Sequence, residues 1–156
     1  MSAEVVSLLY HEVTDAPFET GFQSSGAFAY KHSRRQFAEN LDQIEDSGGQ
    51  CTLVTALDFS EKKKSFLLTF DDGGKSAMYI ADAIELRNMR GHFFVTTNQI
   101  GTRYFMSERD IRELHTRGHV IGSHSHAHPC PFGLLPKDLQ VQEYRISCEI
   151  LEDIIQ

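Results

Sequence analysis

The sequence has no long apolar segment and carries few basic residues. No apolar run approaches the roughly 20 residues that a membrane-spanning helix requires. Acidic residues outnumber basic ones by 22 to 15, which gives a formal net charge of −7 at pH 7. Because an acidic surface repels phosphate groups, we expect neither a nucleic acid nor an anionic membrane surface as the main partner.

Cysteine is scarce as well, and the first residues do not have the pattern of a signal peptide. Cys51, Cys130 and Cys148 show no paired spacing of the kind found in disulfide frameworks or cysteine metal sites. The first residues lack a basic segment followed by a long apolar one, so no signal peptide is predicted. A mature chain without its leader would look the same, which leaves the compartment open with a slight preference for the cytoplasm.

The pattern of apolar residues predicts an α/β fold with a parallel sheet. The chain of 156 residues is long enough for one domain with a hydrophobic core. Short apolar runs predict strands at 5–10, 51–54, 65–70, 92–97 and 119–123. Helical spacing and capping residues predict helices that begin after Ser33 and Ser107, and others at 75–90 and 137–155. Alternation of strands and helices is typical of βαβ units.

This order predicts that several polar residues lie at one edge of the sheet. Parallel strands end at the same edge, and α/β proteins bind their ligands there. Asp71 and Asp72 follow the strand at 65–70, and His124 follows the last strand. His11 follows the first strand, which makes it a candidate substrate-binding residue.

The segment at 122–129, GSHSHAHP, is unusual because it holds His124, His126 and His128 within five positions. Zinc binds imidazole nitrogen and carboxylate oxygen, and a catalytic zinc site has three protein ligands and one open position. In a helical turn His124 and His128 would share a face, whereas in an extended run all three histidines would point the same way. The alternative interpretation is a polar loop beside an acidic turn, since Asp and Gly are common turn residues.

Two motifs resemble those of a known family. T-F-D-D-G at 69–73 and H-S-x-x-H at 124–128 resemble the first two motifs of the polysaccharide deacetylases, carbohydrate esterase family 4. The phrases HFFVTT, RGHVIGSHSHAHP and LLYHEV are also similar to segments of such enzymes. The resemblance covers most of the chain. It implies a distorted, parallel-stranded (β/α) barrel with fewer than eight strands, incomplete in this chain.

The resemblance also implies a function and a set of roles. Asp71 would be the catalytic base, and Asp72, His124 and His128 would bind the metal, while His126 occupies a variable position. Zinc is the expected ion, although cobalt or nickel suits the same ligands. The implied reaction is hydrolysis of N-acetyl groups on amino-sugar oligosaccharides or polysaccharides.

The later motifs of the family are absent from this sequence. They include an Asp-Trp motif and a histidine that acts as general acid, whereas this chain contains no tryptophan and ends at Gln156. We therefore expect 1–156 to be a deacetylase-like catalytic domain truncated at its C-terminus. Its open parallel edge would need cover from a second copy or another chain. Two alternatives stay open: hydrolysis of another non-peptide C–N bond, and a non-catalytic domain that keeps the metal and binds carbohydrate or a partner.

Overall fold

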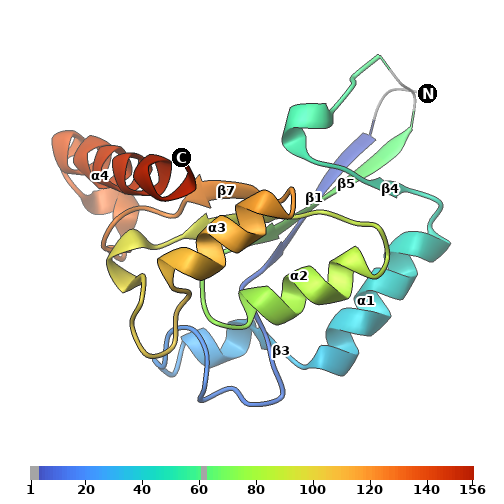
Figure 1. Ribbon diagram of the computed structural model, residues 1–156, viewed down its shortest axis with the longest axis horizontal. Coiled ribbons are helices and arrows are strands. Elements are labelled where there is room, and N and C mark those ends of the chain that lie inside the picture. Colours follow the sequence, from blue (N-terminus) through green and yellow to red (C-terminus); the bar gives the residue numbers. More distant parts are fainter. Residues whose placement is uncertain (1–3, 61–62) are drawn as a thin grey trace.

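A parallel sheet forms the centre of the molecule in the computed structural model, which describes residues 4–60 and 63–156 (Figure 1). Its five strands are β1 (Glu4–Tyr10), β4 (Gln50–Cys51), β5 (Lys64–Phe70), β6 (His92–Val95) and β7 (Val120–Ser123). The strand order is β1-β5-β6-β7, and β4 pairs with the beginning of β5. A small second sheet pairs β2 (Glu12–Val13) with β3 (Lys31–His32). The predicted α/β class and parallel sheet are confirmed.

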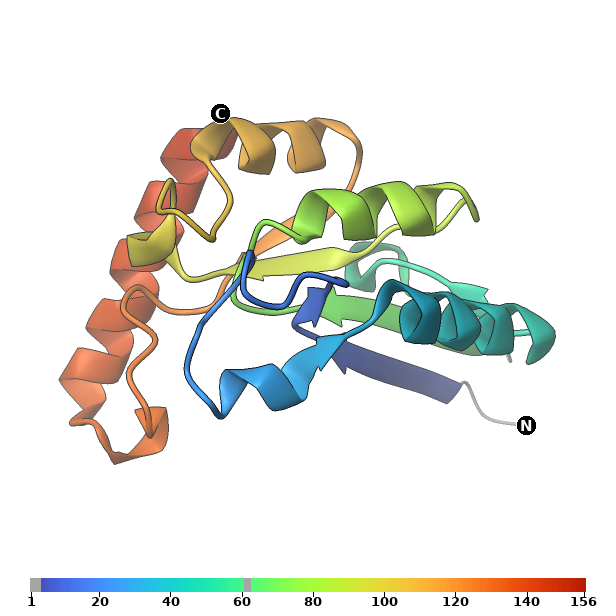
Figure 2. The ribbon, with the colours of Figure 1, turned by 90° about the horizontal axis from the view of Figure 1, so that it is seen from below.

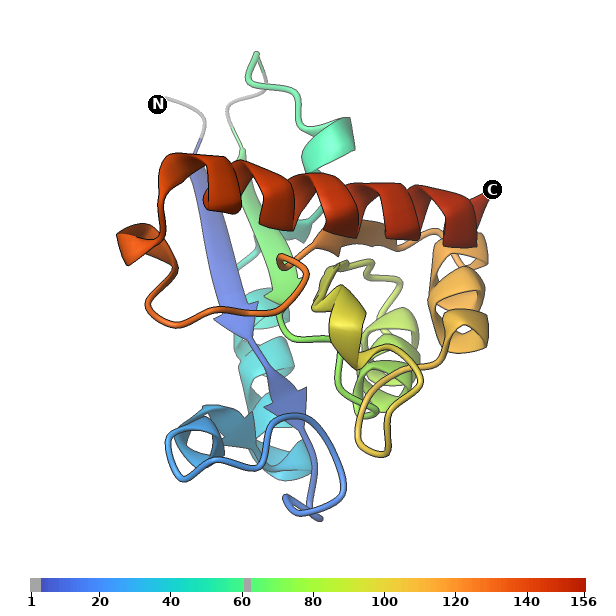
Figure 3. The same cartoon turned by 90° about the vertical axis from the view of Figure 1, so that its left-hand side faces the viewer.

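Four α-helices surround the sheet. They are α1 (Arg34–Asp46), α2 (Ala77–Glu85), α3 (Glu108–Thr116) and α4 (Lys137–Ile155). The first three lie in front of the sheet in Figure 1, and α4 crosses beside β7 in Figure 3. Short 3-10 helices occur at η1 (Ala27–Tyr30), η2 (Val54–Ala56), η3 (Thr97–Gln99) and η4 (Phe132–Leu134). Within the described ranges, no helix is long and apolar enough to cross a membrane.

Local sequence signals explain where the helices begin. Ser33 and Ser107 each form a capping box, in which the serine side chain accepts a hydrogen bond from the third helical N–H. The apolar faces of α1, α2 and α3 pack against β5 and β6 in one core cluster. Its members include Phe37, Leu41, Ile44, Leu68, Phe70, Ile80, Ile84, Phe93, Ile111 and Leu114. Burial of these side chains supplies the main driving force for the fold.

The strand predicted at 92–97 ends at Val95, and two further predicted elements are also shorter than the sequence pattern indicates. The helix predicted at 75–90 ends at Glu85, because Asn88 takes a left-handed φ of 57° and reverses the chain. The strand predicted at 51–54 ends at Cys51. Beyond it, the Val54 N–H donates to Nε2 of His92 at 2.9 Å, and the chain turns into η2. In both cases a tertiary contact or a turn overrides the local pattern.

The register of the sheet brings the carboxyl ends of its strands to one edge. Paired residues at or near these ends are Tyr10 with Phe70, Phe70 with Phe93, and Val95 with Ser123. The residues that directly follow β1, β5 and β7 are His11, Asp71 and His124. The parallel arrangement therefore places the predicted polar residues together, as the order of elements indicated.

Candidate active site

Asp72, His124 and His128 form a compact group at this edge. The Nε2 atoms of His124 and His128 lie 3.4 Å and 3.6 Å from Oδ1 of Asp72. Each residue offers one ligand atom, and these atoms all lie within 4.8 Å of one another. The structure thus brings together the three residues that the sequence analysis named as metal ligands. The spacing is suited to a single cation between them.

The backbone after β5 turns sharply to aim Asp72 into this group. Asp72 has a φ of 73° and Gly73 a φ of 82°, both in the left-handed region. For a residue other than glycine this conformation costs roughly 1–2 kcal/mol. The Thr96 N–H holds the turn by donating to the Asp72 carbonyl at 3.2 Å, and the Met106 N–H donates to the Gly73 carbonyl at 3.0 Å. Strain of this kind persists where surrounding contacts fix it, commonly at functional sites.

The histidine segment adopts neither of the two simple geometries. Ser125 and His128 have left-handed φ values of 64° and 52°, so the chain curls instead of forming a helical turn or an extended run. The His128 N–H donates to Oγ of Ser125 at 3.1 Å and closes the curl. His126 turns away from the group, and its Nδ1 lies 3.0 Å from the Thr97 hydroxyl.

A glutamate on α4 supports this curl and was missed by the sequence analysis. One carboxylate oxygen of Glu143 accepts hydrogen bonds from the backbone N–H groups of His126 and Ala127, at 2.9 Å and 2.7 Å. Two charge-assisted bonds to adjacent amides fix the loop more strongly than neutral bonds would. The contact depends on how α4 packs beside β7, and no local sequence signal reports that packing.

The electrostatics of the group fit a cation. Asp72 is only 6% exposed, and its Oδ1 has no hydrogen-bond partner among the described residues. A buried carboxylate oxygen without a donor is costly, and a bound cation would compensate for it. His124 faces both aspartates, because its Nε2 points to Asp72 while its Nδ1 lies 3.9 Å from Oδ2 of Asp71. Such a second carboxylate orients the ring of a ligating histidine.

Asp71 lies beside this group with a perturbed acidity. Burial raises the pKa of the Asp71 carboxyl to about 6, the nearby His11 opposes the shift, and the neighbouring Asp72 charge adds to it. Its backbone N–H donates to the Tyr10 carbonyl at 2.9 Å, which ties the residue to the end of β1. A carboxylate with a pKa near neutrality is well matched to proton transfer.

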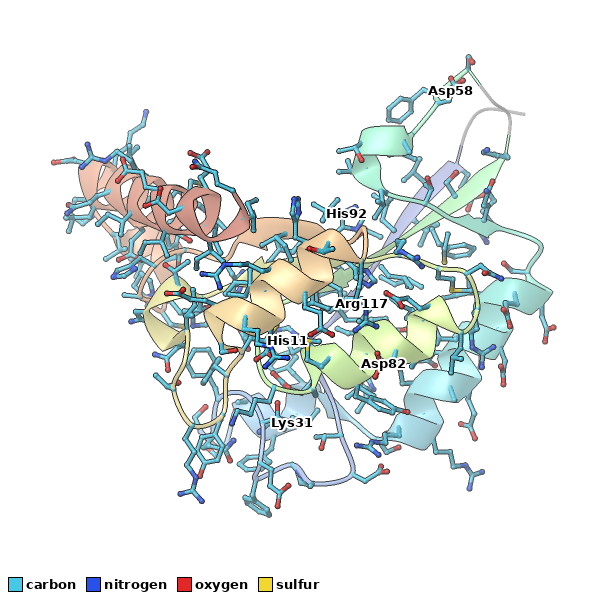
Figure 4. All side chains as sticks on the ribbon, viewed as in Figure 1. His11, Lys31, Asp58, Asp82, His92 and Arg117 are labelled. Carbon is cyan, nitrogen blue, oxygen red and sulfur yellow. The ribbon has the colours of Figure 1, made fainter. Side chains whose placement is uncertain are left out.

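A pocket of about 320 Å³ opens next to the group. Asp72, His128 and His11 line one side of it. The long segment between β2 and β3, including η1, lines the other side, and Figure 2 shows it in blue beyond the end of β1. The His11 ring stacks on Tyr30 with centroids 4.7 Å apart. Figure 4 shows His11 and Lys31 on the same side of the molecule, away from His92.

Glu12 anchors this segment and is the second residue that the sequence analysis missed. It is 2% exposed, and its Oε2 accepts hydrogen bonds from the hydroxyl groups of Thr20 and Ser76. A Cβ on Gly21 or Gly74 would lie 2.5 Å or 1.8 Å from Oε1 of Glu12, so a side chain at either position would displace the Glu12 carboxylate. No sequence signal marked it, because its role depends on contacts with Thr20 and Ser76 that form only in the fold. We refer to Glu12, Thr20 and Ser76 as the Glu12 clamp.

The fold and the site together define an α/β protein in which an aspartate and two histidines lie close together at the carboxyl ends of the strands. Such a group is suited to binding a metal. Comparison with known proteins makes the assignment specific. The polysaccharide deacetylase family model matches residues 59–155, more than half of the chain. The chain therefore belongs to the polysaccharide deacetylase family, and the matched region contains Asp71, Asp72, His124 and His128.

One curated relative carries the name of the same family. Putative polysaccharide deacetylase YxkH of Bacillus subtilis (strain 168) is 25% identical over 145 residues, which cover 88% of this chain and 48% of that protein. The chain thus spans about half the length of this curated relative.

Solved structures confirm the fold. Streptococcus pyogenes deacetylase PplD, in complex with acetate, matches with a TM-score of 0.79 at 19% identity, over 99% of this chain and 70% of that one. IcaB from Ammonifex degensii matches with a TM-score of 0.76 at 23% identity, over 99% and 72%. The expected deacetylase-type barrel is thus present as an open sheet that corresponds to part of these longer chains.

The Glu12 clamp leads to a prediction about stability. Burial raises the pKa of the Glu12 carboxyl from 4.5 to about 7, while the two hydroxyl hydrogen bonds oppose the shift. Asp72 adds to the shift and Lys31 opposes it. A raised pKa means that the contribution of Glu12 to stability is full below about pH 4.5 and is lost as the pH rises through 7.

We therefore expect the free energy of unfolding of the metal-free protein to fall less steeply between pH 4.5 and 7 in Glu12→Gln than in the wild type. Urea denaturation in the presence of a chelator measures both curves. Asp71, whose raised pKa acts in the same direction, is present in both proteins and cancels in the comparison. Identical slopes would show that the buried carboxyl is not the titrating group.

Proposed function

We propose that this protein hydrolyses N-acetyl groups on amino-sugar oligosaccharides or polysaccharides, with a divalent metal held by Asp72, His124 and His128. The observation that carries the proposal is the buried Oδ1 of Asp72, which has no hydrogen-bond partner among the described residues and is faced by two imidazole nitrogens. Membership in the polysaccharide deacetylase family supports the same reaction. The chemistry of the donor set favours zinc, and cobalt or nickel accepts the same ligands.

The metal and Asp71 have separate tasks in this proposal. A bound cation would lower the pKa of a water molecule and polarise the amide carbonyl of the substrate. Asp71 would accept the proton of the attacking water, because its carboxyl lies beside the group and its pKa is raised to about 6. The Thr96 and Met106 amides hold the turn that keeps Asp72 oriented.

His11 supplies the step for which the sequence analysis found no residue. The departing amine needs a proton, and a histidine is the usual donor near neutral pH. His11 lines the pocket with Asp72 and His128, and its charge acts on Asp71. Among the described residues at this edge, His11 is a histidine that lines the pocket without belonging to the metal group. We assign it this role in addition to contact with the substrate.

The metal assignment predicts a stoichiometry. After zinc reconstitution and dialysis, elemental analysis should find about one zinc per chain, as a three-ligand site implies. Asp72→Ala and His124→Ala should lose this zinc. The matched control is His126→Ala, which lies in the same loop but outside the group and should retain it. A wild type without zinc, or equal losses in all three variants, would contradict the assignment.

The role of Asp71 predicts a variant that keeps the metal and loses activity. Asp71→Asn removes the proton acceptor but keeps the shape of the side chain. We expect acetate release from N-acetylated oligosaccharides to fall by about 10²-fold or more in kcat/KM. Zinc content should stay at the wild-type value. If the wild type binds zinc yet releases acetate from no acetylated substrate, the protein is a binding domain instead.

The role of His11 predicts a dependence on the leaving group. An amine must be protonated to depart, whereas 4-nitrophenolate departs as a stable anion. His11→Gln should therefore lower kcat for an N-acetylated oligosaccharide by about 10²-fold, and lower hydrolysis of 4-nitrophenyl acetate much less. His115→Gln, on the exposed side of α3, serves as the control. Equal losses on the two substrates would argue against proton donation by His11.

A further inference from the structure

A buried histidine lies at the edge of the sheet opposite the candidate metal group. His119 directly precedes β7, and the four residues of that strand separate it from His124. Its side chain is 0% exposed, and its ring contacts Phe93 of β6, with centroids 5.1 Å apart. The proposed reaction makes no use of His119. Its surroundings therefore point to a role of its own in the fold.

Hydrogen bonds to the His119 ring determine which nitrogen carries the proton. The Gly91 N–H donates to Nδ1 at 3.2 Å, so Nδ1 is the unprotonated nitrogen. Nε2 lies 2.8 Å from Oε1 of Glu85 and is the nitrogen that donates. The neutral ring thus satisfies both partners. A second proton, on Nδ1, would place two N–H groups against each other and break the bond from Gly91.

Three charged groups face the ring, and together they do not compensate for its burial. They are Glu85 of α2, Arg90 in the turn after α2, and Arg117 at the end of α3. Glu85 favours a charged imidazole, but its Oε1 also accepts a hydrogen bond from Nε of Arg117 at 2.9 Å. Burial lowers the pKa of His119 below its ordinary value of 6.5, and both guanidinium groups act in the same direction. The folded protein therefore holds the ring neutral.

The groups around His119 connect three elements at the amino edge of the sheet. His119 itself links the start of β7 to the turn before β6 and to α2. Arg117 forms an ion pair with Asp82 of α2 at 2.6 Å, and the two residues lie together in Figure 4. Nε of Arg90 donates to the Arg117 carbonyl at 2.9 Å, which ties the turn before β6 to the end of α3. Loss of the Gly91 bond would act on the joint where β6 and β7 begin.

We propose that His119 is an acid-sensitive switch at the amino edge of the sheet. A second proton on its ring breaks the hydrogen bond from Gly91, adds a positive charge beside Arg90 and Arg117, and opens the joint between α2, β6 and β7. The switch goes beyond the proposed function, because none of its groups belongs to the candidate metal group at the other edge.

The direction of the pH dependence follows from the lowered pKa. The open form takes up a proton with the ordinary histidine pKa of 6.5, whereas the closed form stays neutral to a lower pH. The stabilisation by His119 is therefore full above 6.5 and is lost as the pH falls below this value. This sign is opposite to that of the Glu12 clamp, whose contribution is lost as the pH rises.

Hydrogen exchange of the Gly91 amide measures the opening directly. Lowering the pH from about 7.5 to about 5.5 should favour the open form by about tenfold, while the closed form holds His119 neutral. The protection of the Gly91 N–H, measured by NMR and corrected for the intrinsic pH dependence of exchange, should therefore fall by about tenfold in the wild type. A protection that does not change would overturn the proposal.

Two substitutions of histidine serve as a matched pair. His119→Asn keeps an oxygen that can accept from Gly91 but does not titrate, so Gly91 protection should change by less than about twofold over the same range. His115→Asn removes an exposed histidine of α3 and should keep the tenfold fall. An equal fall in both variants would show that another group titrates and would contradict the assignment to His119.

The amides of α1 distinguish local opening from unfolding of the whole chain. In the described parts of the chain, α1 forms no hydrogen bond with His119, Glu85 or Arg117. Protection in α1 should therefore change much less than protection of Gly91, and an equal fall would mean that acid unfolds the entire protein. Circular dichroism verifies that each variant folds. Should His119→Asn fail this check, His119→Gln is a second replacement that does not titrate.

Discussion

The Asp72 carboxylate is the constraint on which the arrangement of this edge depends. It is buried beside a second carboxylate, and its Oδ1 finds no hydrogen-bond partner in the described parts of the chain. Burial raises the pKa of Asp71, and the neighbouring Asp72 charge adds to this shift. Two carboxylates in a poorly solvated site favour a cation between them. The same need explains the left-handed backbone of Ser125 and His128, because the resulting curl directs the imidazoles of His124 and His128 to Oδ1 of Asp72.

The supports of the site come from three directions. The turn after β5 is held by the Thr96 amide, the histidine curl is held by Glu143 of α4, and the pocket wall is held by Glu12. Two of these three supports, Glu143 and Glu12, are carboxylates that accept hydrogen bonds from buried or partly buried groups. Catalytic geometry requires such secondary contacts, since ligands on unsupported loops would lose their positions. The site is thus built by packing between elements as much as by its own motifs.

Local signals made much of this structure predictable. Apolar strands, capping serines and helical spacing act over a few residues, so β1, β5, α1, α3 and α4 agree closely with the sequence analysis. The parallel order also placed Asp71 and His124 at one edge. Glu12 and Glu143 escaped notice because their roles arise only when distant segments pack together. The same reason explains why spacing could not decide between two conformations of the histidine segment, and the structure shows a third.

Two adjacent residues after β1 show how one short segment serves both chemistry and architecture. Neighbouring side chains in an extended segment point in opposite directions. His11 accordingly stacks on Tyr30 in the pocket wall, while Glu12 is buried against α2 in the clamp. Because Tyr30 belongs to the segment that Glu12 anchors, the clamp also supports the position of His11. The beginning of the chain thus brings a histidine and a buried carboxylate to the edge at which the two central motifs lie.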